Sequence, residues 1–292
     1  MQYRTLGRTG LRVSQIGFGG AVVGIANYLE AWDPHNPACR ETVTAALQRA
    51  LDLGVNYFDT AEGYGAGASE EIMGEVLGRR RGECLIATKV SSREPAQIRL
   101  ACEASLRRLQ TETIDVYQFH GSWYDAQDVT AILDRGGLET MQALQAEGKV
   151  RFLGFTAEAP TAEVSQLIQT GAFDVVQLRY NLMYQHACDY VNNRGVMPEA
   201  SARDLGVVVM RPLTSGTFQK LMRQAAPQLT PPEVHRLLLQ YVLSNPHVHV
   251  AIVGMRRMAE VEENAALCDD LAGRYDLTEL HERFVEAVDT GQ

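Results

Sequence analysis

The sequence has few cysteines, no long apolar run and no leader-like segment. Its five cysteines are widely spread and none is paired at metal-binding spacing, so neither a zinc site nor a disulfide framework is expected. No apolar run approaches the ~20 residues that a membrane-spanning helix needs. The first residues also lack the apolar segment of a signal peptide. We therefore expect a cytoplasmic protein with no bound metal and no membrane partner.

A basic surface is missing as well. The chain has 292 residues, with 27 Lys and Arg against 36 Asp and Glu, which leaves a net charge of −9. Proteins that bind nucleic acid need a basic footprint, so no nucleic-acid partner is expected. Hydrophobic residues make up 46% of the chain, which is enough for a large core.

Short apolar runs alternate with amphipathic helical stretches along the chain. The eight runs are Val13–Gly19, Val55–Thr60, Cys84–Val90, Ile114–Phe119, Val150–Phe155, Val175–Tyr180, Val207–Met210 and Val248–Val253. They are mostly apolar, as is typical of parallel strands buried on both faces. Asn36-Pro37 and Thr230-Pro231 are typical N-termini of helices. Repeated strand–helix units without a change in composition predict one domain over residues 1–292.

Eight strand–helix units predict an α/β fold in which the strands close into a (β/α)8 TIM barrel. The turn signal Arg8-Thr9-Gly10, ahead of the first run, predicts an N-terminal β-hairpin. An open, doubly wound sheet is the alternative that the length also permits. Because a barrel carries its chemistry in the loops that follow the C-terminal ends of its strands, candidate site residues are sought there.

An acid, a lysine and a histidine lie at the ends of three consecutive runs. These are Asp59, Lys89 and His120, and Tyr64 lies in the loop beyond Asp59. Each alone is more typical of a helix cap, a surface residue or a packing residue. In a barrel, however, all four would converge on the same mouth.

Together these residues form a plausible proton-transfer site. A free tyrosine has a pKa of about 10, and a nearby ammonium such as that of Lys89 would lower it. Asp59 would keep Lys89 charged, and His120 could donate a hydrogen bond to a substrate oxygen. Such a site exchanges a proton at a carbonyl or alcohol centre, so a redox reaction would need a cofactor to supply the hydride.

A recurring pattern surrounds these residues, in one order along nearly the whole chain. It is carried by Met1–Gly20, Asn56–Gly65, Thr88-Lys89-Val90, Ser105–His120, Glu147–Gly154, Val175–Asn181, Arg211-Pro212-Leu213 and Val253–Asn264. These segments resemble the aldo-keto reductase family. The resemblance implies a (β/α)8 barrel that binds NADP, or alternatively NAD, in extended form. It also implies the catalytic tetrad Asp59, Tyr64, Lys89 and His120, with Tyr64 as general acid.

The resemblance also implies a set of cofactor contacts. They are Gly20, Ala21, Thr156, Gln177, Met210, Arg211, Pro212, Leu213, Gly254, Arg256, Arg257, Glu260, Glu263 and Asn264. Thr156 and Gln177 would hold the nicotinamide carboxamide. Met210 stands where an aromatic ring often stacks under the nicotinamide, so a sulfur contact would replace stacking. Glu263 and Asn264 would contact the adenine.

A further position in this set departs from the family pattern. Glu260 stands where many members carry an arginine for the cofactor's 2′-phosphate, and a carboxylate there would repel that phosphate. Arg256 and Arg257 are close enough in sequence to compensate. The resemblance to the family still implies NADP in preference to NAD.

Aromatic residues in the loops are candidates for the substrate wall. Trp32, Trp123 and Tyr124 could line the pocket, although the last two could equally pin down their own loop. The long connection 185–198 is typical of a lid. None of these loops carries a signature that names a substrate, and no oligomeric state is predicted.

The resulting prediction is an NAD(P)H-dependent oxidoreductase that reduces an aldehyde or ketone to the alcohol, with a small-molecule carbonyl substrate. Two alternatives remain open at this point. One is a cofactor-bound regulatory or binding protein with the same fold. The other is a barrel lyase that uses Lys89 as a Schiff-base nucleophile.

Overall fold

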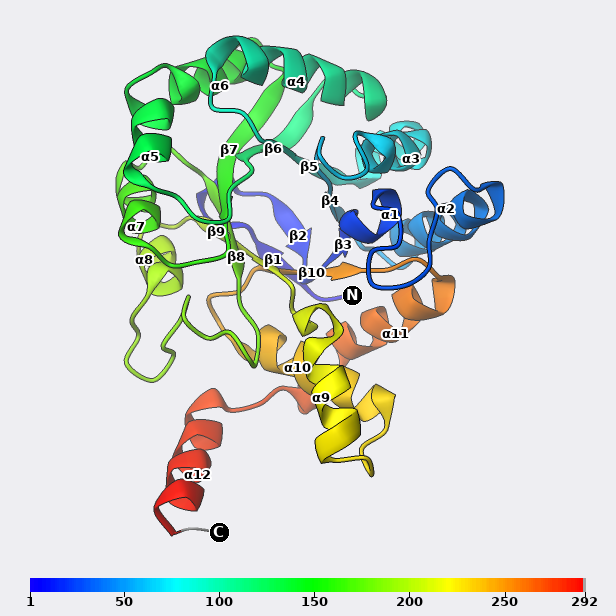
Figure 1. The fold of residues 1–292 in the computed structure, drawn as a ribbon, viewed down its shortest axis with the longest axis vertical. Coiled ribbons are helices and arrows are strands. Elements are labelled where there is room, and N and C mark those ends of the chain that lie inside the picture. Colours follow the sequence, from blue (N-terminus) through cyan, green and yellow to red (C-terminus); the bar gives the residue numbers. More distant parts are fainter. Residues whose placement is uncertain (291–292) are drawn as a thin grey trace.

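A computed structural model describes residues 1–290 and the side chains of residues 1–283, so residues 291–292 of the predicted domain lie outside the described residues. At its centre is a closed barrel of parallel strands, in the order β10-β3-β4-β5-β6-β7-β8-β9 (Figure 1). The barrel strands are β3 Ile16–Gly19, β4 Tyr57–Asp59, β5 Leu85–Val90, β6 Ile114–Phe119, β7 Val150–Ala157, β8 Val175–Arg179, β9 Gly206–Met210 and β10 Val250–Gly254. The predicted (β/α)8 barrel is thereby confirmed.

Helices surround the barrel, and two of them begin at the capping residues that the sequence predicts. The α-helices are α1 Ala21–Gly24, α2 Pro37–Asp52, α3 Ala68–Leu77, α4 Pro95–Arg108, α5 Ala126–Leu133, α6 Gly137–Ala146, α7 Ala162–Gln169, α8 Val196–Ala202, α9 Thr217–Ala225, α10 Pro231–Ser244, α11 Met258–Asp269 and α12 Leu277–Thr290. Short 3-10 turns are η1 Gly7–Thr9, η2 Gly78–Glu83, η3 Thr214–Gly216 and η4 Leu271–Gly273. The Asn36 side chain accepts a hydrogen bond from Ala38 N, and Thr230 forms a capping box with Glu233. Both predicted helix starts are confirmed.

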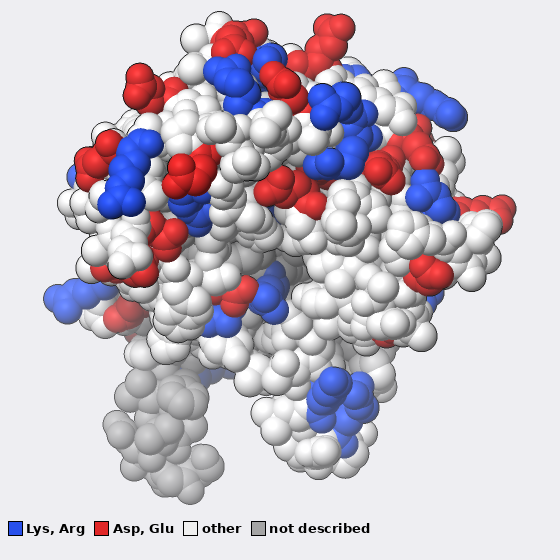
Figure 2. Space-filling view, turned by 45° about the horizontal axis from the view of Figure 1, so that its top comes forward, with Lys and Arg blue, Asp and Glu red and all other residues white. Residues whose placement is uncertain are grey.

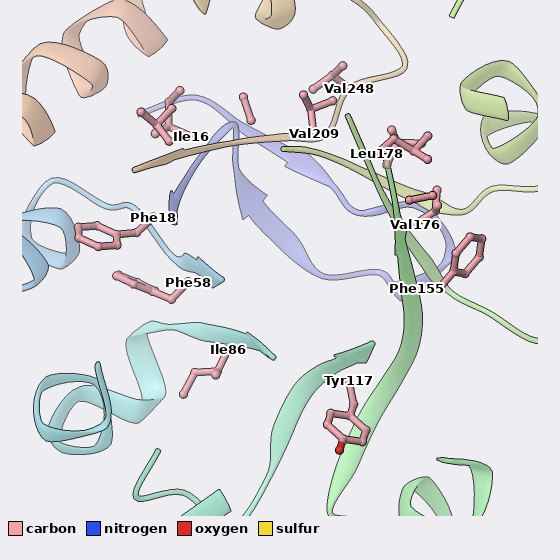
Figure 3. Packing of buried hydrophobic residues seen from close by; sticks show 14 of the residues in the cluster. Ile16, Phe18, Phe58, Ile86, Tyr117, Phe155, Val176, Leu178, Val209 and Val248 are labelled. Atoms are coloured by element: carbon pink, nitrogen blue, oxygen red, sulfur yellow. The ribbon is translucent and has the colours of Figure 1, made fainter. Parts of the chain in front are cut away.

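Two apolar layers hold the barrel together. Alternate strand residues point outward and pack against the helices, as Phe18, Phe58, Ile86 and Tyr117 do in Figure 3. The inward-facing set fills the barrel and comprises Tyr57, Ala87, Val116, Val175, Val208, Val250 and Ile252. Burying each large apolar side chain contributes about 1.5–3 kcal/mol. The barrel is therefore a packed core rather than a pore.

The N-terminal hairpin closes the lower end of the barrel. β1 Tyr3–Thr5 pairs antiparallel with β2 Arg12–Ser14, and Leu6 and Val13 join the inward-facing cluster. The predicted strand Val13–Gly19 is thus wrong as one element, because the chain passes from hairpin to barrel at Gln15. Here Ser14 Oγ donates to Ile16 O at 2.7 Å, a side-chain bond that turns the backbone. The other seven runs match their strands to within two residues at each end.

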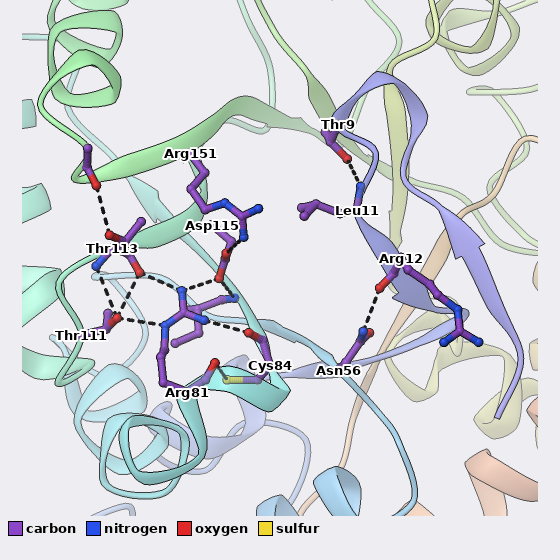
Figure 4. A network of polar contacts seen from close by, with 12 residues as sticks. Thr9, Leu11, Arg12, Asn56, Arg81, Cys84, Thr111, Thr113, Asp115 and Arg151 are labelled. Carbon is purple, nitrogen blue, oxygen red and sulfur yellow. Dashed lines mark hydrogen bonds and ion pairs between the residues drawn. The ribbon is translucent and has the colours of Figure 1, made fainter.

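A buried carboxylate ties three strands together near their N-terminal ends. Asp115 on β6 accepts hydrogen bonds from Arg81 and Arg151, each at 2.6 Å, and from Ile86 N at 2.8 Å (Figure 4). Arg81 also donates to backbone carbonyls around it, including that of Thr113 at 2.9 Å. A buried charge that lost these partners would be strongly destabilising. This network lies at the end of the strands opposite to their C-terminal ends and holds the barrel's shape.

Candidate active site

A cavity of about 440 Å³ opens at the C-terminal ends of the barrel strands. Its lining includes Asp59, Tyr64, Lys89 and His120, so the structure brings the four predicted catalytic residues to one place. The space-filling view shows a hollow near the middle of the face drawn, with both acidic and basic side chains at its rim (Figure 2). On that face the two signs of charge are interspersed rather than gathered into a basic surface.

Strand register positions the charged pair. Asp59 is the last residue of β4, and Lys89 lies on the neighbouring β5, two residues beyond the register partner of Asp59. Lys89 Nζ donates to Asp59 Oδ1 at 2.7 Å and to Thr60 O at 2.6 Å. The two side chains are only 1% and 3% exposed. The barrel therefore holds a buried ion pair at the base of the cavity.

A tight turn after β4 places Tyr64 above this pair. Tyr64 N donates to Ala61 O at 3.0 Å, and Tyr64 O accepts from Ser69 N at 3.2 Å. The centroid of the Tyr64 ring lies 5.0 Å from Lys89 Nζ. The His120 ring meets it edge to face, with centroids 5.7 Å apart. The phenol is thus enclosed by an ammonium on one side and an imidazole on another.

Burial and charge oppose each other in the ion pair. Burial raises the pKa of Asp59, and the Lys89 ammonium only partly reverses this. Burial lowers the pKa of Lys89, but its interactions with the Asp59 carboxylate and with Tyr64 outweigh burial, and the net direction is upward. Lys89 is therefore held as an ammonium, as the sequence argument expected.

The pKa values of Tyr64 and His120 shift in opposite directions in the folded protein. Burial raises the pKa of Tyr64 by more than the Lys89 ammonium lowers it. This corrects the expectation of a net lowering: the effect of Lys89 is present, but burial exceeds it. Burial, together with the positive charges of Lys89 and Arg93, lowers the pKa of His120 to about 4. At neutral pH, Tyr64 is a protonated donor and His120 is an uncharged ring.

Many of the predicted cofactor contacts line the same cavity. These are Ala21, Thr156, Gln177, Met210, Arg211, Pro212, Leu213 and Gly254. Gln177 Oε1 accepts a hydrogen bond from Gln118 Nε2 at 3.1 Å. The hydroxyl of Thr156 is engaged with the backbone of Gly121, donating to its carbonyl at 2.8 Å. Gln177 and Thr156 are thus fixed in place at the cavity wall.

Gly20 differs from this group. Its N–H donates to Asp59 O at 2.7 Å, and a Cβ built on Gly20 would lie 2.6 Å from Ser69 Oγ. It is a site of close packing beside the catalytic strand and does not line the cavity. A direct contact between Gly20 and a cofactor stays a prediction.

The remaining predicted cofactor contacts lie around the start of α11, outside the cavity wall. The Arg256 side chain is buried, and Arg257 pairs with Glu30 and Glu260. Asn264 is also buried, donating to Glu260 O at 2.7 Å and contacting His235 at 2.9 Å, whereas its neighbour Glu263 is exposed. The two arginines are therefore already engaged by acids of the chain itself.

The three aromatic candidates for the substrate wall do not line the cavity. Trp32 is buried and donates from Nε1 to Val23 O at 2.8 Å. Tyr124 is buried against Phe155 and donates to a strand carbonyl. Trp123 is 69% exposed. The loop thus turns Tyr124 inward, as the loop-packing alternative expected, and leaves Trp123 in solvent.

Sequence reasoning missed several residues that line the cavity. They are Tyr28, Leu29, Ser122, Glu158, Ser215 and Gln219. Glu158 follows directly after β7, and a charged residue beyond a strand end was a usable signal for it. It accepts from Arg211 at 2.6 Å and from Arg179 at 3.2 Å. The long connection 185–198, expected as a lid, contributes no lining residue here and borders a separate cavity near α12.

Comparison with known proteins decides the family. The family model described as "Aldo/keto reductase family" matches residues 15–237. The chain belongs to the aldo/keto reductase family. As a member, the protein is an oxidoreductase.

Three relatives illustrate the range of this family. L-galactose dehydrogenase of Arabidopsis thaliana is 29% identical over 93% of this chain and 89% of its own. A probable voltage-gated potassium channel subunit beta of Oryza sativa is 31% identical over 75% of this chain and 66% of its own. An aldo/keto reductase of Klebsiella pneumoniae, solved in complex with NADP and acetate, is 28% identical with a TM-score of 0.74, covering 96% of this chain and 93% of that one.

Two further findings concern the described part of this reductase. None of its helices is long and apolar enough to cross a membrane. Within the same residues, no cluster of three or more His, Cys, Asp or Glu side chains is placed to hold a metal ion.

Proposed function

We propose that this protein is an NADP-dependent carbonyl reductase that converts an aldehyde or ketone to the alcohol, with Tyr64 as the proton donor. The observation that carries the proposal is the buried Asp59–Lys89 ion pair beneath Tyr64, on the floor of a cavity open at the barrel mouth. A protonated phenol next to an ammonium is suited to give a proton to a carbonyl oxygen.

The cavity is suited to a nicotinamide ring. Most of its lining is apolar, while Thr156 and Gln177 bring polar groups to one wall. Asp59 Oδ2, at the cavity floor, is a buried acceptor with no hydrogen-bond partner among the described residues, and a ligand with N–H donors would satisfy it. The related Klebsiella pneumoniae enzyme was solved with NADP. Bound there, the nicotinamide would supply the hydride.

The residues of the chain account for the proton. Tyr64 donates its hydroxyl proton to the carbonyl oxygen as that oxygen gains negative charge. Lys89 stabilises the phenolate that Tyr64 becomes, and Asp59 keeps Lys89 in place and charged. His120, uncharged at neutral pH, can donate a hydrogen bond to the same oxygen and orient it.

The two alternatives are less well supported by this geometry. A Schiff-base lysine must be a neutral amine, whereas the raised pKa of Lys89 keeps it an ammonium bonded to Asp59. The channel-subunit relative favours a binding or regulatory role. A protein that only binds has no need of an ion pair buried under a phenol, since taking both charges out of water is costly.

The test is a titration of the purified protein with NADPH and separately with NADH, followed by cofactor fluorescence. A panel of aldehydes, ketones and hydroxylated aldehydes is then added. We expect tight NADPH binding and oxidation of the cofactor that depends on a carbonyl compound. A bound cofactor that no carbonyl compound oxidises would favour the regulatory alternative. Binding of neither cofactor, with borohydride trapping of a substrate on Lys89, would favour the lyase.

A further inference from the structure

Glu30 lies in the loop between α1 and α2 and joins two arginines that precede α11. Arg257 Nη2 donates to both carboxylate oxygens of Glu30, each at 2.9 Å. Arg256 Nη1 donates to Glu30 Oε1 at 3.0 Å. We infer that Glu30 determines how strongly this reductase discriminates between cofactors with and without a 2′-phosphate. The inference rests on the proposed function only in requiring that a nicotinamide cofactor binds.

The two arginines are not equally available to a ligand. Arg256 is 3% exposed, and it donates to Val22 O at 2.7 Å and to Tyr28 O at 3.0 Å. Its guanidinium also packs over the Trp32 ring, 4.5 Å from the centroid. Breaking these contacts would dismantle the loop, so Arg256 is a structural anchor. Arg257 has a side chain that is 51% exposed and is the cation that can turn toward a phosphate.

Arg257 is nevertheless flanked by two acids. Its Nη1 donates to Glu260 Oε1 at 2.7 Å, while its Nη2 is held by Glu30. Glu260 also accepts from the backbone N–H of Arg256 at 2.6 Å and of Arg257 at 3.1 Å. It therefore occupies the N–H groups at the start of α11, where an anion would otherwise bind. The two arginines and two glutamates sum to zero charge.

These groups adjoin the residues that line one side of the cavity. Residues Ile252, Val253 and Gly254 of β10 line the cavity wall, and Arg256 and Arg257 follow directly in the chain. The loop that carries Glu30 also supplies Tyr28 and Leu29 to the wall. A cofactor that extended from the cavity along Gly254 would therefore bring its far end near Glu30, Arg257 and Glu260.

A 2′-phosphate and a 2′-hydroxyl on the cofactor would interact with Glu30 and Arg257 in different ways. To donate to a phosphate, Arg257 must release Glu30, and the freed carboxylate then repels the phosphate. A hydroxyl needs no such exchange and can itself donate to a carboxylate oxygen. Hydrogen bonds from Arg257 and Arg256 outweigh burial and lower the pKa of Glu30, so this competing charge is present at neutral pH. Glu30 therefore weakens NADP binding without weakening NAD binding.

The test compares Glu30→Gln with a matched variant, Glu262→Gln. Glu262 lies on α11 and pairs with Arg49 at 2.8 Å, so its replacement also removes one exposed negative charge and one ion pair, but away from Arg257. Calorimetry gives the Kd of NADP⁺ and NAD⁺, and of 2′-phospho-ADP-ribose and ADP-ribose, which lack the nicotinamide. The Kd of the phosphorylated ligands should fall about fivefold in Glu30→Gln, the equivalent of one exposed ion pair. Those of the other two ligands should stay within about twofold.

Several outcomes would overturn the inference. One is an unchanged ratio of the two Kd values in Glu30→Gln. Another is an equal change in Glu262→Gln, which would show a general effect of net charge. Thermal unfolding of both variants checks that the loop is intact. If the unsubstituted protein binds neither NADP⁺ nor NAD⁺, the proposed function fails together with the inference, whereas an unchanged ratio with tight binding removes the inference alone.

Discussion

Lys89 Nζ lies 2.7 Å from Asp59 Oδ1, and both side chains are almost completely withdrawn from water. Each charge is tolerated because the other is present, since a buried unpaired charge is costly. The ammonium end of this pair lies beneath the Tyr64 ring. The pair thus fixes the Lys89 ammonium at the cavity floor, next to the ring of Tyr64 where a phenolate would form.

Replacing Tyr64 by Phe removes the proposed proton donor and little else. Turnover should fall by about 10²- to 10⁴-fold, the contribution of a general acid, while the Kd for NADPH changes little. The matched control is Tyr28→Phe, which removes a phenolic hydroxyl from the same cavity wall. Steady-state kinetics and fluorescence titration measure both quantities. A Tyr64→Phe enzyme as active as the parent would remove Tyr64 from the mechanism.

Breaking the buried ion pair should cost stability as well as activity. Asp59→Asn leaves the Lys89 ammonium without its carboxylate, and the free energy of unfolding should fall by about 3–5 kcal/mol. Glu147→Gln, which removes a surface carboxylate that pairs with Lys149 and Arg99, should have a much smaller effect. Denaturant unfolding of the two variants provides the comparison. Similar losses in both would show that the Asp59–Lys89 pair is not held as described.

The lowered pKa of His120 predicts a dependence of stability on pH. Burial and nearby positive charges bring this pKa from 6.5 to about 4 in the folded protein. Between these two values the unfolded chain binds the proton and the folded protein does not. Stability is therefore lost as pH falls through this interval and is unaffected by this group above it. Replacing His120 by Gln should flatten that slope in denaturant unfolding, whereas replacing the exposed His35 by Gln should not.

The neighbours Trp123 and Tyr124 should behave in opposite ways. Tyr124 is buried against Phe155, so Tyr124→Ala should destabilise the protein by about 3–5 kcal/mol. Trp123 points into solvent, and Trp123→Ala should leave the melting temperature and KM unchanged. A large rise in KM in Trp123→Ala would restore this residue to the substrate wall.

Much of the fold and the catalytic cluster could be predicted because both depend on local sequence patterns. Buried parallel strands are apolar throughout, so runs such as Ile114–Phe119 stand out. A charged residue at the end of such a run either caps the helix that follows or lies at the mouth of the barrel. Asp59 and Lys89, on neighbouring strands, could therefore be placed side by side without coordinates.

The contacts of Arg256 and of the loop residues Trp123 and Tyr124 could not be predicted in this way. Arg256 is engaged by Glu30 across 226 residues of sequence, and no local pattern reports such a partner. An aromatic residue in a loop can equally turn into the core or into solvent, as Tyr124 and Trp123 do. The pKa of Tyr64 likewise depends on how deeply the ring is enclosed, which spacing along the chain does not reveal.

The plug that Leu6 and Val13 form at the bottom of the barrel also has a consequence for access. With the lower end filled by these side chains, the barrel interior offers no route from below to the cavity above the ion pair. A molecule that reaches the ion pair must therefore arrive from the rim of the cavity, at the C-terminal ends of the strands, and leave by the same side.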